Sequence, residues 1–295
     1  MGYHRAGVMP QTEACTTLIT SAREFEKTGA GHLLGIYAHA GQSYAINSST
    51  AAIDFLRQEF EALLVVANEI QTSSSEPRGL VLSVGATPTT TSVRNLLIKS
   101  PSIQEDTASL EGKAIHALRA TIDAVNRLDC KIEIHAGVYC VLDLQQLATR
   151  ALPDSALNWS DIALTLIAEV VSLYPGRGED GTTEALIGAG SLALGREPCK
   201  AYPGWGILTP WNREDAKVHE GSIEEHRGWQ VGKVSQEHGI LQWKGKAGSE
   251  EELEIGQKVR IWGNHACVVG AGFGWYFVVD GSDEIVDVWP RWNGW

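Results

Sequence analysis

Long apolar runs, paired cysteines and an excess of basic charge are all missing from this chain of 295 residues. No stretch of about 18 apolar residues occurs, so the sequence predicts no membrane-spanning helix. The five cysteines are scattered and include no Cys-x-x-Cys pair, which indicates reduced thiols in a cytoplasmic protein. A formal net charge of −12 argues against nucleic acid or an anionic membrane as a partner. Residues Met1–Val8 lack the apolar core of a secretory signal.

Apolar strand-like segments alternate with amphipathic segments through the first half of the chain. We expect short strands over residues 33–38, 79–84 and 130–135. We expect helices over about residues 10–27, from Ser48 or Ser49 to about Ile70, and over about 107–128. Alternating strands and helices predict an α/β fold with a parallel sheet whose faces are covered.

The second half of the chain has a different composition, because all ten tryptophans lie at or beyond Trp159. We expect residues 1–152 to form part of an α/β barrel and residues 153–295 to form an antiparallel β domain. Short strands broken by glycine and proline are predicted at 206–208, 229–231, 239–241, 257–262, 275–279 and 284–288. Residues 162–173 are a long apolar run without a clear helical period.

The three predicted parallel strands all end in small or polar residues. These ends are His39-Ala40-Gly41, Gly85-Ala86-Thr87-Pro88-Thr89 and His135-Ala136-Gly137. In a parallel barrel the carboxyl ends of the strands carry the active site, and glycines there let backbone N–H groups approach a phosphate. Three strands are too few to close such a barrel, so either the sheet is open or the first part of the fold is missing.

His265 and Cys267 place an imidazole and a thiol two residues apart near the C-terminus. The flanking segments Lys258–Trp262 and Val268-Val269 are typical of strands, so we expect both side chains on one face of a strand. Imidazole and thiolate together suit zinc, and two protein ligands leave open positions, as in a catalytic metal site. A packed pair without metal is the alternative that this spacing leaves open.

Seven motifs, in order along the chain, resemble the eukaryotic-type D-serine dehydratase family, whose relatives include D-threonine aldolase and alanine racemase. They are Gly2–Val8, Gly35–Gly41, Leu82–Thr89, Glu133–Tyr139, Glu184–Ile187 with Ala189–Ser191, Ser235–Gly239 and Asn264–Cys267. The resemblance implies pyridoxal 5′-phosphate and zinc as cofactors. It also implies an alanine-racemase-type (β/α) barrel with a C-terminal β domain, elimination of ammonia from D-serine to give pyruvate, and a homodimer.

The resemblance also assigns roles to particular residues. Arg5 would lie near the cofactor's phenolic oxygen or the substrate carboxylate, with a salt bridge at a helix start as the alternative. Tyr37 and His39 would contact the cofactor, although Tyr37 as a core aromatic and His39 bonded to a backbone carbonyl are equally compatible with the sequence. Tyr139 would border the pocket or pack in the barrel. The phosphate cradle would comprise Ser83, Gly85, Ala86, Thr87, Gly137 and Val138, and the zinc ligands would be His265 and Cys267.

In this family a lysine forms the Schiff base with the cofactor, and it precedes the motif that Gly2–Val8 matches. None of the lysines in this chain lies in a matching motif, so the chain is expected to be N-terminally truncated and inactive by itself. Two alternatives stay open: a D-threonine aldolase or related β-hydroxy-D-amino-acid lyase, and an inactive fragment that only binds. The aldolases resemble this chain but carry an aspartate where it has Cys267, and a thiolate favours zinc over harder ions.

Overall fold

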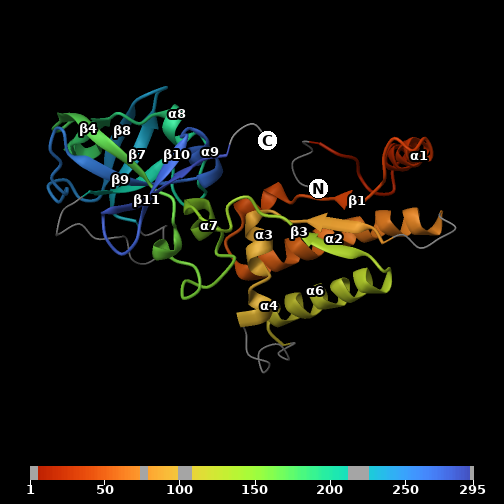
Figure 1. Cartoon of the computed structure of the whole chain (residues 1–295). Coiled ribbons are helices and arrows are strands. Elements are labelled where there is room, and N and C mark those ends of the chain that lie inside the picture. The colour runs from red at the N-terminus through yellow and green to blue at the C-terminus, as the bar shows by residue number, and fades with distance from the viewer. Residues whose placement is uncertain (1–5, 74–78, 99–107, 212–225, 293–295) are drawn as a thin grey trace. The chain divides into compact units, whose positions relative to one another are not determined.

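The computed structural model describes residues 6–73, 79–98, 108–211 and 226–292 (Figure 1). The chain divides into two compact units. The N-terminal unit holds the described residues up to Tyr139 together with Thr149–Ala156, and the C-terminal unit holds Cys140–Ala148 and the residues from Leu157 onward. Residues 140–148 therefore fold with the C-terminal unit, although they precede the boundary predicted at residue 152. Within the described ranges, no helix is both long enough and apolar enough to cross a bilayer.

A parallel sheet in the order β1-β2-β3 forms the centre of the N-terminal unit. Its strands are β1 (Gly35–Tyr37), β2 (Val81–Val84) and β3 (Lys131–Ile134). Helices α2 (Ser49–Thr72) and α6 (Leu110–Arg127) connect these strands and pack against them (Figure 1). The predicted α/β class with a parallel sheet is therefore confirmed.

Capping side chains fix where the long helices begin. The hydroxyl of Ser48 accepts the amide N–H of Ala51 at the start of α2, and that of Ser109 accepts the amide of Gly112 at the start of α6. The apolar face of α2 is buried in one core with residues of β2 and α6, and each large side chain there contributes about 1.5–3 kcal/mol by burial. The other helices of the unit are α1 (Glu13–Lys27), η1 (Gly41–Ala45), α3 (Thr87–Ser92) and α4 (Asn95–Ile98).

Six antiparallel strands close into a barrel in the C-terminal unit, in the order β4-β5-β8-β7-β6-β9. They are β4 (Leu166–Tyr174), β5 (Glu184–Ile187), β6 (Gly206–Pro210), β7 (Gly228–Val234), β8 (Gly239–Lys244) and β9 (Lys258–Gly263). The apolar run at 162–173 thus supplies most of β4, in which Ala168 and Val170 are buried in the barrel core. The sequence did not predict β5.

Short elements and one hairpin complete the C-terminal unit. The hairpin pairs β10 (Trp275–Val279) with β11 (Ile285–Pro290) in antiparallel fashion, and both strands were predicted. The elements are η2 (Trp159–Asp161), η3 (Glu179–Gly181), α7 (Leu144–Thr149), α8 (Ser191–Leu194), α9 (Ala266–Ala271), β10 (Trp275–Val279) and β11 (Ile285–Pro290).

The strand expected around His265 and Cys267 is wrong. β9 ends before His265, whose extended backbone caps α9, so Cys267 and Val268-Val269 lie in a helix. The physical reason is the buried carboxylate of Asp143, which accepts the amide N–H of the first helical residue. The two side chains therefore occupy a helix cap and a first turn, not alternate positions on a strand.

Candidate functional site

Aromatic and imidazole rings from two strand ends of the parallel sheet lie against one another. The ring of Tyr37, at the end of β1, stacks on the imidazole of His135, just beyond β3, with centroids 4.5 Å apart and an interplanar angle of 14°. The ring of His39 lies 6.0 Å from that of His135. Tyr37 is 64% exposed, so it is not the core aromatic that the sequence also allowed. The strand ends thus present stacked flat rings, a surface that suits a flat heteroaromatic ligand.

His135 has one ring nitrogen with a defined partner and one without. The Ser83 hydroxyl donates to Glu133 Oε1 at 2.6 Å and lies 3.1 Å from His135 Nδ1. Because the hydroxyl proton goes to Glu133, Nδ1 carries the imidazole proton and Nε2 carries the lone pair. Burial, with the charge of His39, lowers the pKa of His135 and favours this neutral form. Nε2 is buried without a partner among the described residues, which indicates a place for a hydrogen-bond donor of a ligand.

Gly85 holds the end of β2 in a conformation that only glycine adopts easily. Its φ is +136°, and a Cβ there would lie 2.2 Å from the carbonyl oxygen of His135 and 2.5 Å from Thr90 Oγ1. The Nδ1 atom of His39 lies 2.7 Å from the Gly85 carbonyl oxygen. His39 therefore makes the backbone contact that the sequence left as an alternative, and its contact with a cofactor stays a prediction.

Backbone amides of the expected phosphate cradle already have partners within the protein. The pairs are Gly85 N with Glu59 Oε1 (3.2 Å), Ala86 N with Thr89 Oγ1 (2.9 Å) and Val138 N with Thr87 Oγ1 (3.2 Å). These bonds fix the turns after β2 and β3, so a phosphate held by the same amides would have to share or replace them. Gly137 and Tyr139 are exposed, and Arg5 lies outside the described residues.

A hollow in the N-terminal unit lies beside β1. It has a volume of about 650 Å³, is lined mainly by apolar residues of α1, β1 and α2, and reaches Tyr37 and His39. Such a lining accepts apolar groups and offers few partners to a charged substrate.

In the C-terminal unit, His265 is oriented by a glutamine. Its Nδ1 lies 2.7 Å from Gln145 Oε1, and Gln145 Nε2 donates to the carbonyl of Pro198 at 2.7 Å. Because the amide nitrogen is committed to Pro198, the amide oxygen faces the imidazole and Nδ1 carries the proton. Nε2 of His265 then carries the lone pair that a metal requires, an arrangement common around metal-binding histidines.

The carboxylate of Asp143 joins the starts of two helices at the same place. Its Oδ2 accepts the amide of Ala266 at 2.9 Å and its Oδ1 accepts that of Gln146 at 3.0 Å. Burial raises the pKa of Asp143, and these amides and His265 only partly offset that rise. Burial, followed by the charge of Asp143, also raises the pKa of the Cys267 thiol.

The side chains of His265 and Cys267, at the start of α9, fit an open metal site. Imidazole and thiol are both zinc ligands, and Cys267 is exposed. Among the residues that the structure describes, no three His, Cys, Asp or Glu side chains are grouped so that they could share a metal ion. Zinc bound by this pair would therefore keep positions for water or substrate.

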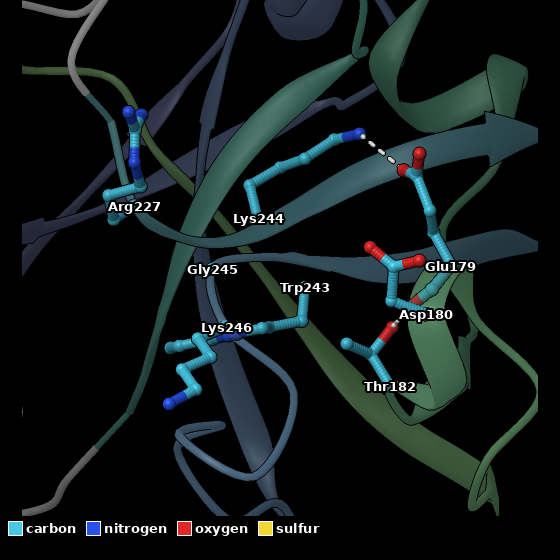
Figure 2. Close-up of a pocket in the computed structure, with 8 residues that line it drawn as sticks. All are labelled: Glu179, Asp180, Thr182, Arg227, Trp243, Lys244, Gly245 and Lys246. Carbon is cyan, nitrogen blue, oxygen red and sulfur yellow. Dashed lines mark hydrogen bonds and ion pairs between the residues drawn. The ribbon is translucent and has the colours of Figure 1, made fainter.

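A second hollow, of about 360 Å³, lies on the barrel (Figure 2). Charges of both signs line it, and Lys244 Nζ lies 3.6 Å from Glu179 Oε2. Neither His265 nor any of the stacked rings belongs to its lining. The residues that line it are Glu179, Asp180, Thr182, Arg227, Trp243, Lys244, Gly245 and Lys246.

Sequence reasoning did not identify three residues that shape the strand ends of the parallel sheet and the surroundings of His265. They are His135, Gln145 and Glu59. A signal existed for Glu59, because helical spacing places it with Leu56 and Leu63 on the buried face of α2. His135 stands in a strand-end motif, but the sequence alone assigns it no role. No local pattern marks Gln145, whose contact with His265 spans 120 residues.

Comparisons with known proteins identify relatives over the whole chain. A family described as "Putative serine dehydratase domain" matches residues 163–279. The chain is 35% identical to a D-serine dehydratase of Schizosaccharomyces pombe, over 100% of this chain and 59% of that protein. It is 31% identical to a D-serine dehydratase of Saccharomyces cerevisiae, over 100% of this chain and 61% of that protein. A D-threo-3-hydroxyaspartate dehydratase of Delftia sp. is 28% identical over 99% of this chain and 63% of that protein.

A solved structure of the Delftia dehydratase supports the fold. It is 25% identical with a TM-score of 0.65, over 99% of this chain and 64% of that chain. A variant of the same dehydratase, with a cysteine replaced by alanine, has been solved in a metal-free form, with 24% identity and a TM-score of 0.66 over 99% of this chain and 64% of that chain. This chain spans about three fifths of the length of its curated relatives.

Proposed function

Because the chain belongs to the eukaryotic-type D-serine dehydratase family, we propose that it takes part in eliminating ammonia from D-serine to give pyruvate, with pyridoxal 5′-phosphate and zinc as cofactors. The observation that carries this proposal is the bond between His265 Nδ1 and Gln145, which leaves the lone pair that a metal ligand needs on Nε2 of His265, two residues before Cys267. Since the chain spans 59% of the fission-yeast relative, the activity is proposed for the whole protein that contains these residues.

When bound, pyridoxal phosphate would accept the electron pair left at the substrate Cα, and zinc would act as a Lewis acid toward the leaving hydroxyl. His265 Nε2 and the Cys267 thiolate would hold zinc, with Gln145 keeping the imidazole in the required tautomer. The stacked rings of Tyr37 and His135 would orient a flat ring at the strand ends, and the buried Nε2 of His135 would accept a donor from it.

Further cofactor contacts come from the resemblance and are proposals of the same kind. Arg5 and His39 would lie near the cofactor, Tyr139 would border it, and the turns after β2 and β3 would face its phosphate. These turns are held by the bond between Thr87 and Val138, which supports a preformed binding surface. The turn residues proposed are Ser83, Gly85, Ala86, Thr87, Gly137 and Val138.

A second candidate is a related lyase acting on another β-hydroxy-D-amino acid. The 28% identity to the D-threo-3-hydroxyaspartate dehydratase favours this candidate. Cys267 stands where the resemblance places an aspartate in D-threonine aldolases, so aldol cleavage is the weaker alternative. The products separate the three reactions, because D-serine gives pyruvate, 3-hydroxyaspartate gives oxaloacetate and D-threonine cleavage gives glycine.

Family membership and the cysteines support three further proposals. A small D-amino acid is the proposed substrate and a homodimer the proposed assembly, which sedimentation of the purified protein would test. The structure describes all five cysteines and joins none of them in a disulfide, which supports a reducing compartment such as the cytoplasm.

The test uses the product of the full reading frame that contains these residues, supplied with pyridoxal phosphate and zinc. Pyruvate formation from D-serine is expected, with loss on chelation and recovery on adding zinc. His265→Ala and Cys267→Ala should lower the zinc content measured by mass spectrometry as well as turnover. Cys140→Ala, at an exposed cysteine outside the pair, should keep its zinc. Full zinc content in both ligand variants, or no product from any of the three amino acids, would contradict the proposal.

A further inference from the structure

A buried carboxyl group lies beneath the strand ends that carry the stacked rings. Glu59, on α2, is 0% exposed. Its Oε1 accepts the amide of Ala40 at 2.8 Å and that of Gly85 at 3.2 Å, and its Oε2 lies 3.0 Å from Thr89 Oγ1. All three of these partners are uncharged. Burying a carboxyl group without a cation costs desolvation free energy, and these hydrogen bonds offset part of that cost.

The two amides belong to residues that follow two neighbouring strands. Ala40 follows β1 directly after His39, and Gly85 follows β2. One oxygen atom of Glu59 therefore ties both strand ends to the helix beneath them. The carbonyl of the same Gly85 residue meets His39 Nδ1 at 2.7 Å. Gly85 thus links Glu59 on one side with the imidazole of His39 on the other.

We propose that Glu59 is a positioning residue that fixes the ends of β1 and β2 and, through Gly85, the imidazole of His39. This inference rests on the proposed function, because the strand ends that Glu59 fixes would contact a cofactor only if the protein binds one. The hydrogen bonds themselves do not depend on that function, and they can be tested without any cofactor.

Thr89 lets the carboxyl group exist in two protonation states. Its hydroxyl accepts the amide of Ala86 at 2.9 Å and lies 3.1 Å from the Ala86 carbonyl oxygen. With Glu59 ionised, the hydroxyl donates to Oε2; with Glu59 neutral, the carboxyl donates to the hydroxyl, which then donates to Ala86. Burial, opposed by the bonds to Ala40, Thr89 and Gly85, raises the pKa of Glu59 to about 7. Both states are therefore populated near neutral pH.

In the part of the chain that the structure describes, the groups hydrogen-bonded to Glu59 include no second ionised side chain. Helix α3 contains no charged residue, and η1 contains Tyr44 as its titratable side chain. Besides Glu59, the titratable side chain bonded to the Gly85 backbone is His39, whose ring lies 6.0 Å from that of His135. Any change of amide protection that depends on the Glu59 side chain must therefore disappear when that side chain cannot titrate.

The experiment measures backbone hydrogen exchange at Ala40 and Gly85 in the full protein without added cofactor. Glu59→Met keeps an unbranched side chain of similar length but removes both acceptors, so exchange of both amides should accelerate about tenfold, as for one lost hydrogen bond. Glu59→Gln retains an acceptor oxygen for the two amides and should restore protection to within about twofold of the original. Glu61→Gln, at an exposed position on the same helix, should leave both amides unchanged.

Varying the pH supplies a second measurement that does not need the methionine variant to fold. An ionised carboxylate accepts hydrogen bonds more strongly than a neutral one, so protection of both amides, corrected for intrinsic exchange, should rise about threefold from pH 6 to pH 8. In Glu59→Gln this rise should be absent. An equal rise in Glu59→Gln, or unchanged protection in a folded Glu59→Met, would overturn the proposal.

A titration with pyridoxal 5′-phosphate separates this inference from the proposed function. If the cofactor binds the original protein, Glu59→Met should weaken its binding about tenfold, in step with the loss of amide protection, and Glu59→Gln should not. Absence of cofactor binding in every form, with the exchange results as expected, would refute the proposed function and leave the positioning role intact. Unaltered cofactor binding by Glu59→Met would show that the strand ends fixed by Glu59 do not contribute to cofactor binding.

Discussion

The imidazole of His265 meets the side-chain amide of Gln145 at 2.7 Å, across 120 residues of sequence. Gln145 is itself held by the carbonyl of Pro198, so its orientation is set before any metal binds. Histidine ligands fixed by a second hydrogen bond in this way bind metal more tightly than freely rotating ones.

Gln145→Ala should therefore weaken zinc binding about 10–100-fold while leaving both ligands in place. The measurement is a competition titration against a chelator of known affinity. Gln236→Ala, at an exposed position in the same unit, is the control and should bind zinc as the original does. Equal affinities in the Gln145 and Gln236 variants would show that the glutamine has no part in holding the ligand.

Asp143→Asn should destabilise the C-terminal unit by about 1–3 kcal/mol. An asparagine has one acceptor oxygen, whereas the carboxylate accepts the amides of both Ala266 and Gln146. One of the two helices must then begin with an unpaired amide. Urea unfolding measures the loss, with Asp280→Asn at an exposed site as the control. A stability equal to that of the control would exclude the double cap.

Glu184 should make the barrel sensitive to acid. Burial raises the pKa of Glu184, but Gln242, Lys233 and Arg177 together lower it below its usual value. A carboxyl group whose pKa is lower in the folded state stabilises the fold above its unfolded pKa and loses that contribution as the pH falls. The unfolding temperature of the original protein should therefore fall more steeply from pH 7 to pH 4 than that of Glu184→Gln. Parallel curves for the two proteins would contradict this assignment.

Gly85→Ala should destabilise the N-terminal unit by at least about 1–3 kcal/mol, the usual cost of a strained backbone, because the new Cβ also meets the His135 carbonyl. Chemical unfolding followed by near-UV circular dichroism would measure the change. Gly79→Ala is the matched control, since a Cβ there comes no closer than 4.0 Å to its nearest neighbour. An alanine tolerated equally at both positions would disprove the close approach.

The α/β class and the long helices followed from local rules, because apolar spacing and capping serines such as Ser48 and Ser109 act within a few residues. The helix that contains Cys267 did not follow from local rules. Its sequence, Ala-Cys-Val-Val, is apolar and partly β-branched, which is typical of a strand. A carboxylate 123 residues earlier, on Asp143, begins the helix instead. The candidate ligands were visible in the sequence, but the partners that orient them depend on tertiary structure.

Long-range anchoring of α9 also has a kinetic consequence. The bonds from Asp143 and Gln145 to the start of this helix close loops of more than a hundred residues, and contacts of that range form late because the chain entropy of closure must first be overcome. We therefore expect the ligand pair to be assembled only after the barrel has folded. Zinc would bind a finished unit instead of nucleating one, so the refolding rate of this unit should be the same with the metal present or absent.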